Sequence, residues 1–188
     1  MHQPRSLPLY GFYDTRHTMK NNRIRVLLIM ITILLNLGCD QSTKYLAREE
    51  LKGEDPIHVV GDLFILVYAE NEGAFLGFGS SLPSFLRTVA FRLIPVIFLL
   101  AFLYYIIRNT QFTLAESLFS AFIIGGGVGN LLDRLRFDGV VSDFMHFGVG
   151  SIRTGILNMA DLSITLGVIG LLVTYIIAAR PRHRHEQP

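Results

Sequence analysis

The sequence predicts an all-α membrane bundle of four transmembrane helices, with a small amount of β structure outside the membrane. Three observations support this fold class. Charged residues make up only 17% of the 188 residues and hydrophobic residues make up 51%, whereas soluble domains carry about a quarter charged residues. The chain contains four apolar stretches of the length that crosses a bilayer, which is roughly 20 residues. Basic residues gather beside the ends of these stretches, as they do around membrane helices.

The four apolar stretches cover about residues 25–45, 89–107, 112–132 and 156–179. Pro95 falls inside the second stretch, where it would kink a helix in water. A membrane helix tolerates proline because neighbouring groups satisfy the freed backbone carbonyl. All four stretches are therefore expected to span the membrane as helices.

The distribution of lysine and arginine predicts that both termini lie in the cytoplasm, because basic residues are retained on that side of membrane proteins. The two long loops, at about 46–87 and 133–155, then face the outside. These loops also carry basic residues, namely Lys52, Arg87 and Arg153. The basic residues are therefore more frequent on the side assigned to the cytoplasm but are not confined to it. The residues assigned to the cytoplasmic side are Lys20, Arg23, Arg25, Arg108, Arg180, Arg182 and Arg184.

The chain is expected to form one membrane domain between two tails. Residues 1–23 are predicted to be a cytoplasmic N-terminal tail, residues 24–179 the membrane domain, and residues 180–188 a basic cytoplasmic tail. The first 18 residues lack an apolar run, so Met19 is an alternative start of the protein.

The first outer loop is long enough to hold structure of its own. Its segment IHVVGDLFILVYAENEGAF is rich in β-branched and aromatic residues and is interrupted by Gly61, Asn71 and Gly73. This pattern predicts two or three short strands joined by turns. The second outer loop also mixes apolar residues with glycine and contains several charges.

The composition argues against several kinds of partner. A net charge of +2, with the basic residues at the two ends of the chain, does not fit a nucleic-acid-binding protein. Cys39 is the single cysteine, so no internal disulfide can form. His146 is isolated, and His183 and His185 lie in the basic tail, so no zinc site is predicted.

Polar residues near the outer ends of the spans are the candidates for function, because a charge inside a membrane helix costs at least a few kcal/mol. Asp40 and Lys44 lie four residues apart on one helix face and can form an ion pair. Such a pair either fixes only the end of the first span or also orients a catalytic loop. Both interpretations stay open.

The segment GGGVGNLLDR ends the third span. Its glycines would let another backbone approach closely. Asn130 and Arg134 share one helix face with Asp133 beside it, and Arg134 is placed to fix a carboxylate. A purely structural network at the end of the helix is the alternative.

Two aspartates are expected near the outer surface. Asp143 lies among apolar residues, which should raise the pKa of its carboxyl. Asn158 and Asp161 open the fourth span, where a helix N-cap and a favourable first-turn charge would explain them structurally. If the two carboxylates converge, they suggest an aspartic protease, because neighbouring like charges leave one carboxyl protonated.

Two other functional classes are considered. LNLGC, which ends at Cys39, is similar to the lipobox of bacterial lipoproteins and follows basic residues as a signal peptide would. Three more apolar spans follow it, which argues against a processed lipoprotein. A small proton- or cation-coupled transporter would also use membrane carboxylates, but here the polar groups gather at one membrane face.

Five short motifs occur together on the four spans and the loops between them. They are DQSTK at 40–44, NEGAFLGF at 71–78, GNLLDR at 129–134, GVVSDF at 139–144 and NMAD at 158–161. With these motifs in this order, the chain resembles the bacterial lipoprotein signal peptidases, or signal peptidase II, from about residue 25 to 179. Two positions depart from the family pattern. Ser142 stands where a hydrophobic residue commonly precedes an aspartate, and Leu157 stands where phenylalanine often precedes an asparagine.

The resemblance implies an aspartic endopeptidase of the bacterial cytoplasmic (inner) membrane. It would remove signal peptides from prolipoproteins by cutting before a diacylglyceryl-modified cysteine, without a metal or organic cofactor. Asp143 and Asp161 fall on the family's catalytic aspartates. The expected site-supporting and substrate-binding residues are Asn71, Gly73, Asn130, Arg134, Asn158, Asp40 and Lys44.

The resemblance also implies a fold and a set of partners. A small extracytoplasmic β-cradle is expected, here at about residues 59–78, with a mobile helix closing over a site near the outer face. The expected partners are lipid-modified prolipoproteins, membrane lipid and globomycin-type inhibitors.

Overall fold

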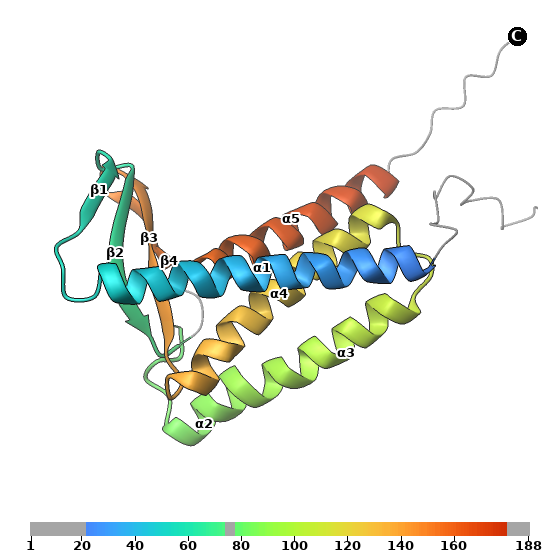
Figure 1. The fold of residues 1–188 in the computed structure, drawn as a ribbon, viewed down its shortest axis with the longest axis horizontal. Helices are drawn as coiled ribbons and strands as arrows, with labels where there is room; N and C mark the ends of the chain where they lie inside the picture. The colour runs from blue at the N-terminus through green and yellow to red at the C-terminus, as the bar shows by residue number, and fades with distance from the viewer. Residues whose placement is uncertain (1–21, 74–77, 180–188) are drawn as a thin grey trace, which may run out of the picture.

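A computed structural model describes residues 22–73 and 78–179, and Figure 1 shows their arrangement as a helical bundle with a small sheet at one end. Four helical segments are long and apolar enough to span a membrane, which confirms the predicted fold class. They are α1 (Asn22–Glu50), the segment made of α2 (Ser84–Thr88), η2 (Val89–Leu93) and α3 (Ile94–Arg108), then α4 (Leu114–Arg136) and α5 (Met159–Ala179).

The ends of the described chain, at Asn22 and Ala179, lie at the same end of the bundle, opposite the sheet (Figure 1). This agrees with the expectation that both termini share one side, but it does not say which side is cytoplasmic. The predicted tails lie almost wholly outside the described residues, as do His183, His185 and Met19. The orientation in the membrane therefore stays a prediction.

The first and second spans extend beyond their predicted boundaries at both ends, and the third extends beyond its predicted end. The second span begins at Ser84, five residues before the predicted start, and contains one π-helical turn at Val89–Leu93. Pro95 follows this turn near the start of α3, and a local π adjustment is one of the ways in which a membrane helix accommodates the missing N–H of proline. The sequence prediction missed the first turn because Ser84 and Arg87 are polar and lie before the apolar run.

Helix α4 forms the centre of the bundle, because it packs against each of α1, α3 and α5. The residues at the centre of this contact are apolar and buried, whereas large apolar residues elsewhere on the helices face outward. Leu100 and Ile169, for example, are 64% and 54% exposed. Such outward apolar surface fits a bundle surrounded by lipid. The buried core residues are Ile29, Ile33, Leu99, Ile106, Ala121, Ile124 and Leu131.

Glycines in α4 let the neighbouring helices approach closely, as the GGGVGN segment predicted. A Cβ atom at Gly126 would overlap the backbone oxygen of Ala160 at the start of α5. A Cβ atom at Gly129 would overlap a carboxylate oxygen of Asp40 on α1. The two glycines therefore set the distances at which α1 and α5 meet α4.

The sheet lies across the end of the bundle and contains β1 (Ile57–Val60), β2 (Phe64–Asn71), β3 (Val141–Val149) and β4 (Ile152–Leu157). The strands pair antiparallel in the order β1-β2-β3-β4. The prediction of strands in the first outer loop is confirmed. The assignment of the cradle to residues 59–78 alone is wrong, because β3 and β4 come from the second outer loop and residues 74–77 lie outside the described part.

The strands of the second loop escaped prediction for a physical reason. The first five residues of β3 are all buried, so they lack the alternation of apolar and polar residues that marks a strand with one wet face. The start of the fourth span was also placed too early, at residue 156. Strand β4 continues to Leu157, and α5 begins only at Met159.

Replacing Gly129 by alanine should destabilise the fold by about 1–3 kcal/mol, the usual effect of an extra carbon in a packed interior. The added methyl group would displace the buried carboxylate of Asp40. Gly38→Ala is the matched control, because a Cβ atom at this helical position meets nothing within 4 Å. Thermal unfolding of the purified variants in detergent measures both effects, and equal stability of the two variants would contradict this account of α4.

Candidate active site

A buried ion pair near the sheet end of α1 anchors the candidate site. The ammonium nitrogen of Lys44 lies 3.0 Å from Oδ2 of Asp40, and both side chains are almost completely buried. Oδ1 of Asp40 accepts a hydrogen bond from the backbone N–H of Ala160 at 2.9 Å. This N–H lies in the first turn of α5, where helical donors have no partner within the helix. The pair predicted from DQSTK therefore also holds the start of α5.

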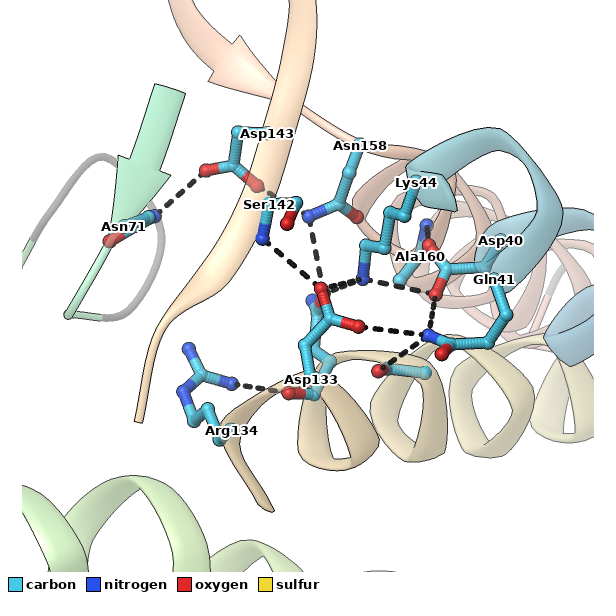
Figure 2. A network of polar contacts seen from close by, with 12 residues as sticks. Asp40, Gln41, Lys44, Asn71, Asp133, Arg134, Ser142, Asp143, Asn158 and Ala160 are labelled. Carbon is cyan, nitrogen blue, oxygen red and sulfur yellow. Dashed lines mark hydrogen bonds and ion pairs between the residues drawn. The ribbon is translucent and has the colours of Figure 1, made fainter. Parts of the chain in front are cut away.

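Asp133 connects the same ion pair to strand β3 (Figure 2). Its carboxylate accepts hydrogen bonds from Nε2 of Gln41 and from the backbone N–H of Ser142, each at 3.1 Å. The ammonium group of Lys44 lies 3.6 Å away. Because Asp133 is fully buried, these contacts compensate for the loss of water around its charge. Asp133 thus joins α1, α4 and β3 in one network.

Asn158 caps α5 as the sequence predicted. Its Oδ1 accepts from the backbone N–H of Asp161 at 3.0 Å, and its own N–H donates to Oδ2 of Asp161 at 3.1 Å. This reciprocal arrangement is that of a capping box. The side-chain nitrogen of Asn158 also donates to Oδ1 of Asp143 at 2.5 Å. The same residue therefore caps a helix and orients a second carboxylate.

Asn130 links Lys44 to Asp161. Its Oδ1 accepts from the ammonium group of Lys44 at 2.8 Å and from Nδ2 of Asn158 at 3.2 Å. A lysine can only donate hydrogen bonds, so the amide oxygen of Asn130 must face it. The amide nitrogen then points to Asp161 and donates to Oδ1 at 3.0 Å. Asn130 and Asn158 together tie the two predicted catalytic carboxylates into one network.

Asp143 lies at the start of β3 and is 3% exposed. Its Oδ2 accepts a hydrogen bond from Nδ2 of Asn71 at 3.0 Å, opposite the bond from Asn158 (Figure 2). Burial raises the pKa of Asp143 to about 6, with a further contribution from the negative charge of Asp161, and the two asparagine bonds oppose this rise. The raised pKa expected from the apolar neighbours of Asp143 is therefore confirmed.

The other residues predicted for the site shape the chain beside Asp143. Oδ1 of Asn71 accepts from the backbone N–H of Gly73 at 2.9 Å. Nη2 of Arg134 donates to the carbonyl oxygen of Gly73 at 2.7 Å, and Nη1 donates to the carbonyl of Asn130 at 3.3 Å. Arg134 was expected to fix a carboxylate; within the described residues it holds a backbone carbonyl instead.

A cleft of about 480 Å³ opens beside Asp143 at the sheet. The end of β2 and the end of β4 contribute lining residues to it. The residues that line it include Ala69, Glu70, Asn71, Asp143, Gly155 and Ile156. An extended polypeptide could therefore reach the Asp143 carboxyl from the sheet side.

A model of the family described as Signal peptidase (SPase) II matches residues 31–177 of this chain. The chain belongs to the signal peptidase II family. As a member of this family, the protein is a protease that removes signal peptides from prolipoproteins. The alternative function as a transporter is not supported. The four membrane-spanning segments make it a multi-pass membrane protein.

Individual relatives agree with this assignment. The lipoprotein signal peptidase of Syntrophus aciditrophicus is 32% identical over 80% of this chain and 93% of its own length. Those of Halothermothrix orenii and Pelodictyon phaeoclathratiforme are 35% and 37% identical, over 79% and 78% of this chain and 94% and 88% of their own lengths. A solved bacterial membrane enzyme shares the fold, with a TM-score of 0.70 and 24% identity over 94% of this chain and 100% of that chain.

Several residues of this signal peptidase II site were missed from the sequence. Asp133 was described only as lying beside the face of Asn130 and Arg134, although it is the central acceptor of the network. Gln41 was not singled out either. Both residues lie inside the motifs DQSTK and GNLLDR, so the motifs themselves were the signal that could have identified them.

Replacing Lys44 by methionine should destabilise the protein by about 3–5 kcal/mol, the usual effect of removing one partner of a buried ion pair. The carboxylate of Asp40 would then be buried without a cation, and Asp133 would keep only the guanidinium group of Arg48 at 3.7 Å. Lys52→Met is the matched control, because Lys52 pairs with Glu70 at 2.6 Å but its side chain is 58% exposed. Exposed pairs contribute little, so thermal unfolding should show almost no change for this control. A similar loss for both variants would contradict the central role of Lys44.

Proposed function

We propose that Asp143 and Asp161 are the catalytic pair of an aspartic endopeptidase that cuts prolipoproteins directly before a diacylglyceryl-modified cysteine. The observation that carries this proposal is the hydrogen-bonded chain Asp143–Asn158–Asn130–Asp161. It joins the carboxyl group of Asp143 on β3, which lines the cleft, to that of Asp161 on α5. Two neighbouring carboxyl groups that share one proton are the working parts of aspartic proteases.

The two carboxyl groups take different roles in this proposal. In this proposal Asp143 retains the shared proton; burial, with the charge of Asp161, raises its pKa to about 6. The Asp161 carboxylate takes a proton from a water molecule as the water oxygen attacks the scissile carbonyl carbon. Asp143 donates its proton to the carbonyl oxygen, so the intermediate is a neutral diol.

The intermediate then collapses and restores the enzyme. The C–N bond breaks, and the leaving nitrogen takes the proton that Asp161 received from water. Asp143 recovers a proton from a hydroxyl group of the diol as the new carboxyl forms. One water molecule is consumed, and the pair returns to its starting protonation state without a metal or an organic cofactor.

The segment Asn71–Gly73 is a candidate for holding the substrate backbone. Asn71 touches both Asp143 and Gly73, and Arg134 fixes the Gly73 carbonyl from the opposite side. These bonds position the end of β2 beside the cleft. A peptide that enters the cleft must pair its own backbone groups, because unpaired polar groups are costly where water is excluded.

The position of the site at the end of the bundle fits a substrate that stays in the membrane. We infer that the protein lies in the bacterial cytoplasmic (inner) membrane with both termini in the cytoplasm and the site near the extracytoplasmic face. The signal peptide would remain in lipid as a helix while its end reaches the site. Membrane lipid and the diacylglyceryl group would then fix the position of the cysteine, and globomycin-type inhibitors would compete for the same place.

The proposal is tested with purified protein and a diacylglyceryl-modified precursor. Cleavage directly before the modified cysteine should be seen by mass spectrometry, and a globomycin-type inhibitor should block it. Cleavage at another bond, or equal cleavage of a precursor whose cysteine carries no lipid, would overturn the assigned specificity.

Asp143→Asn and Asp161→Asn should each lower the cleavage rate by at least about 100-fold, the contribution typical of a general acid or base. Asparagine keeps the shape of the side chain but cannot exchange the proton. Asp138→Asn is the control, because Asp138 is an exposed turn residue with a positive φ of 50° that asparagine also tolerates. Full activity of either site variant would exclude that residue as catalytic.

The rate should depend on pH with a bell-shaped profile that belongs to the pair as a unit. Activity falls at low pH when the pair takes up a second proton, and it falls at high pH when the pair loses its last one. The pKa of about 6 for Asp143 places the alkaline limb of kcat/KM, which reports the free enzyme, near pH 6. The alkaline limb of kcat should lie at higher pH than that of kcat/KM, because bound substrate excludes water from Asp143 and so raises its pKa further. A flat profile between about pH 4 and 9, with chemistry rate-limiting, would contradict the shared proton.

A further inference from the structure

The last turn of α1 contributes an arginine that reaches strand β3. Nη1 of Arg48 donates to the hydroxyl oxygen of Ser142 at 2.9 Å. The same nitrogen lies 3.7 Å from Oδ2 of Asp133, and the guanidinium group covers the ring of Phe137 at 4.5 Å. One side chain of α1 therefore contacts the end of α4 and the start of β3.

Ser142 directly precedes Asp143 and is 2% exposed. Its backbone N–H donates to Asp133, and its hydroxyl lies 3.4 Å from the hydroxyl of Tyr68. A buried hydroxyl group is unfavourable unless it has hydrogen-bond partners. Arg48 supplies such a partner, which explains how this chain accommodates a serine where a hydrophobic residue commonly stands.

The sheet alone holds the start of β3 on one side only. Strand β4 pairs with β3 from Met145 onward and does not reach Asp143. On the other side, Asp143, Ser142 and Val141 pair in register with Ala69, Glu70 and Asn71 of β2, and a bulge interrupts the pairing only beyond them, between Leu66 and Ala69. The edge of β3 that faces away from β2 has no strand partner at Asp143, so contacts from outside the sheet hold that edge.

Successive side chains of a strand point to opposite faces, so Arg48 acts on Ser142 and not on the neighbouring Asp143 carboxyl. We propose that Arg48 and Ser142 are a positioning pair that fixes the start of β3 against α1 and α4, and so holds Asp143 where Asn158 and Asn71 can bond to it. This proposal rests on the catalytic role of Asp143 proposed above.

The test compares Arg48→Gln, Arg48→Lys, Ser142→Ala and the double variant Arg48→Gln/Ser142→Ala in cleavage of the diacylglyceryl-modified precursor. Arg48→Gln is expected to lower kcat about tenfold and to change KM less than about twofold, the pattern of an interaction that matters for chemistry. Arg48→Lys should recover most of this loss, because an ammonium group can still donate to Ser142. The double variant should be no slower than Arg48→Gln alone, since both changes break one interaction.

The pH profile separates positioning from simple stabilisation. A loosened β3 exposes Asp143 to water, so the alkaline limb of kcat/KM should move to lower pH in Arg48→Gln and return in Arg48→Lys. Arg136→Gln is the matched control, because Arg136 is an exposed arginine at the end of α4 that Arg48 contacts. A lower melting temperature with unchanged kcat and an unchanged limb would reduce Arg48 to a structural role and overturn the proposal.

Asp143→Asn is assayed beside these variants to separate the two proposals. If Asp143→Asn is inactive while Arg48→Gln and Ser142→Ala match the wild type, only the positioning pair is refuted. If effects of Arg48→Gln and Ser142→Ala multiply in the double variant, the two residues do not act as a pair. If Asp143→Asn is active, the catalytic proposal fails and the positioning proposal fails with it.

Discussion

The rest of the structure depends on the ion pairs that the ammonium group of Lys44 makes. This group lies between two buried carboxylates, at 3.0 Å from Asp40 and 3.6 Å from Asp133. Asp40 holds the first turn of α5, and Asp133 holds the backbone at Ser142. This positive charge, with that of Arg48 at 3.7 Å from Asp133, allows two negative charges to be buried, and those charges fix the two elements that carry Asp161 and Asp143.

Neutral amides extend this arrangement to the candidate catalytic groups. Asn130 accepts a hydrogen bond from Lys44 and donates one to Asp161, and Asn158 donates one to Asp143. Amides can do this because they donate and accept at the same time without adding charge. The candidate site therefore contains a charged part that builds the structure and, separated from it by asparagines, the two carboxyl groups that we propose as the catalytic pair.

The four spans were predictable from the sequence, because long apolar runs are local features, and short polar motifs indicated most residues of the candidate site. The burial and raised pKa of Asp143 followed from its apolar neighbours. Strands β3 and β4 were not predictable, because the buried start of β3 has no alternating pattern. The contacts of Asp133 and Arg48 were also hidden, since Arg48 and Ser142 lie 94 positions apart and only the folded bundle brings them together.

The capping box at the start of α5 has one further consequence. Asn158 and Asp161 exchange two hydrogen bonds that begin the helix, and the same side chains contact Asp143 and Asn130. Fraying of this helix end would therefore separate the two carboxyl groups of the candidate site in the same event. A substitution at Asn158 would change the helix start and the position of Asp143 together.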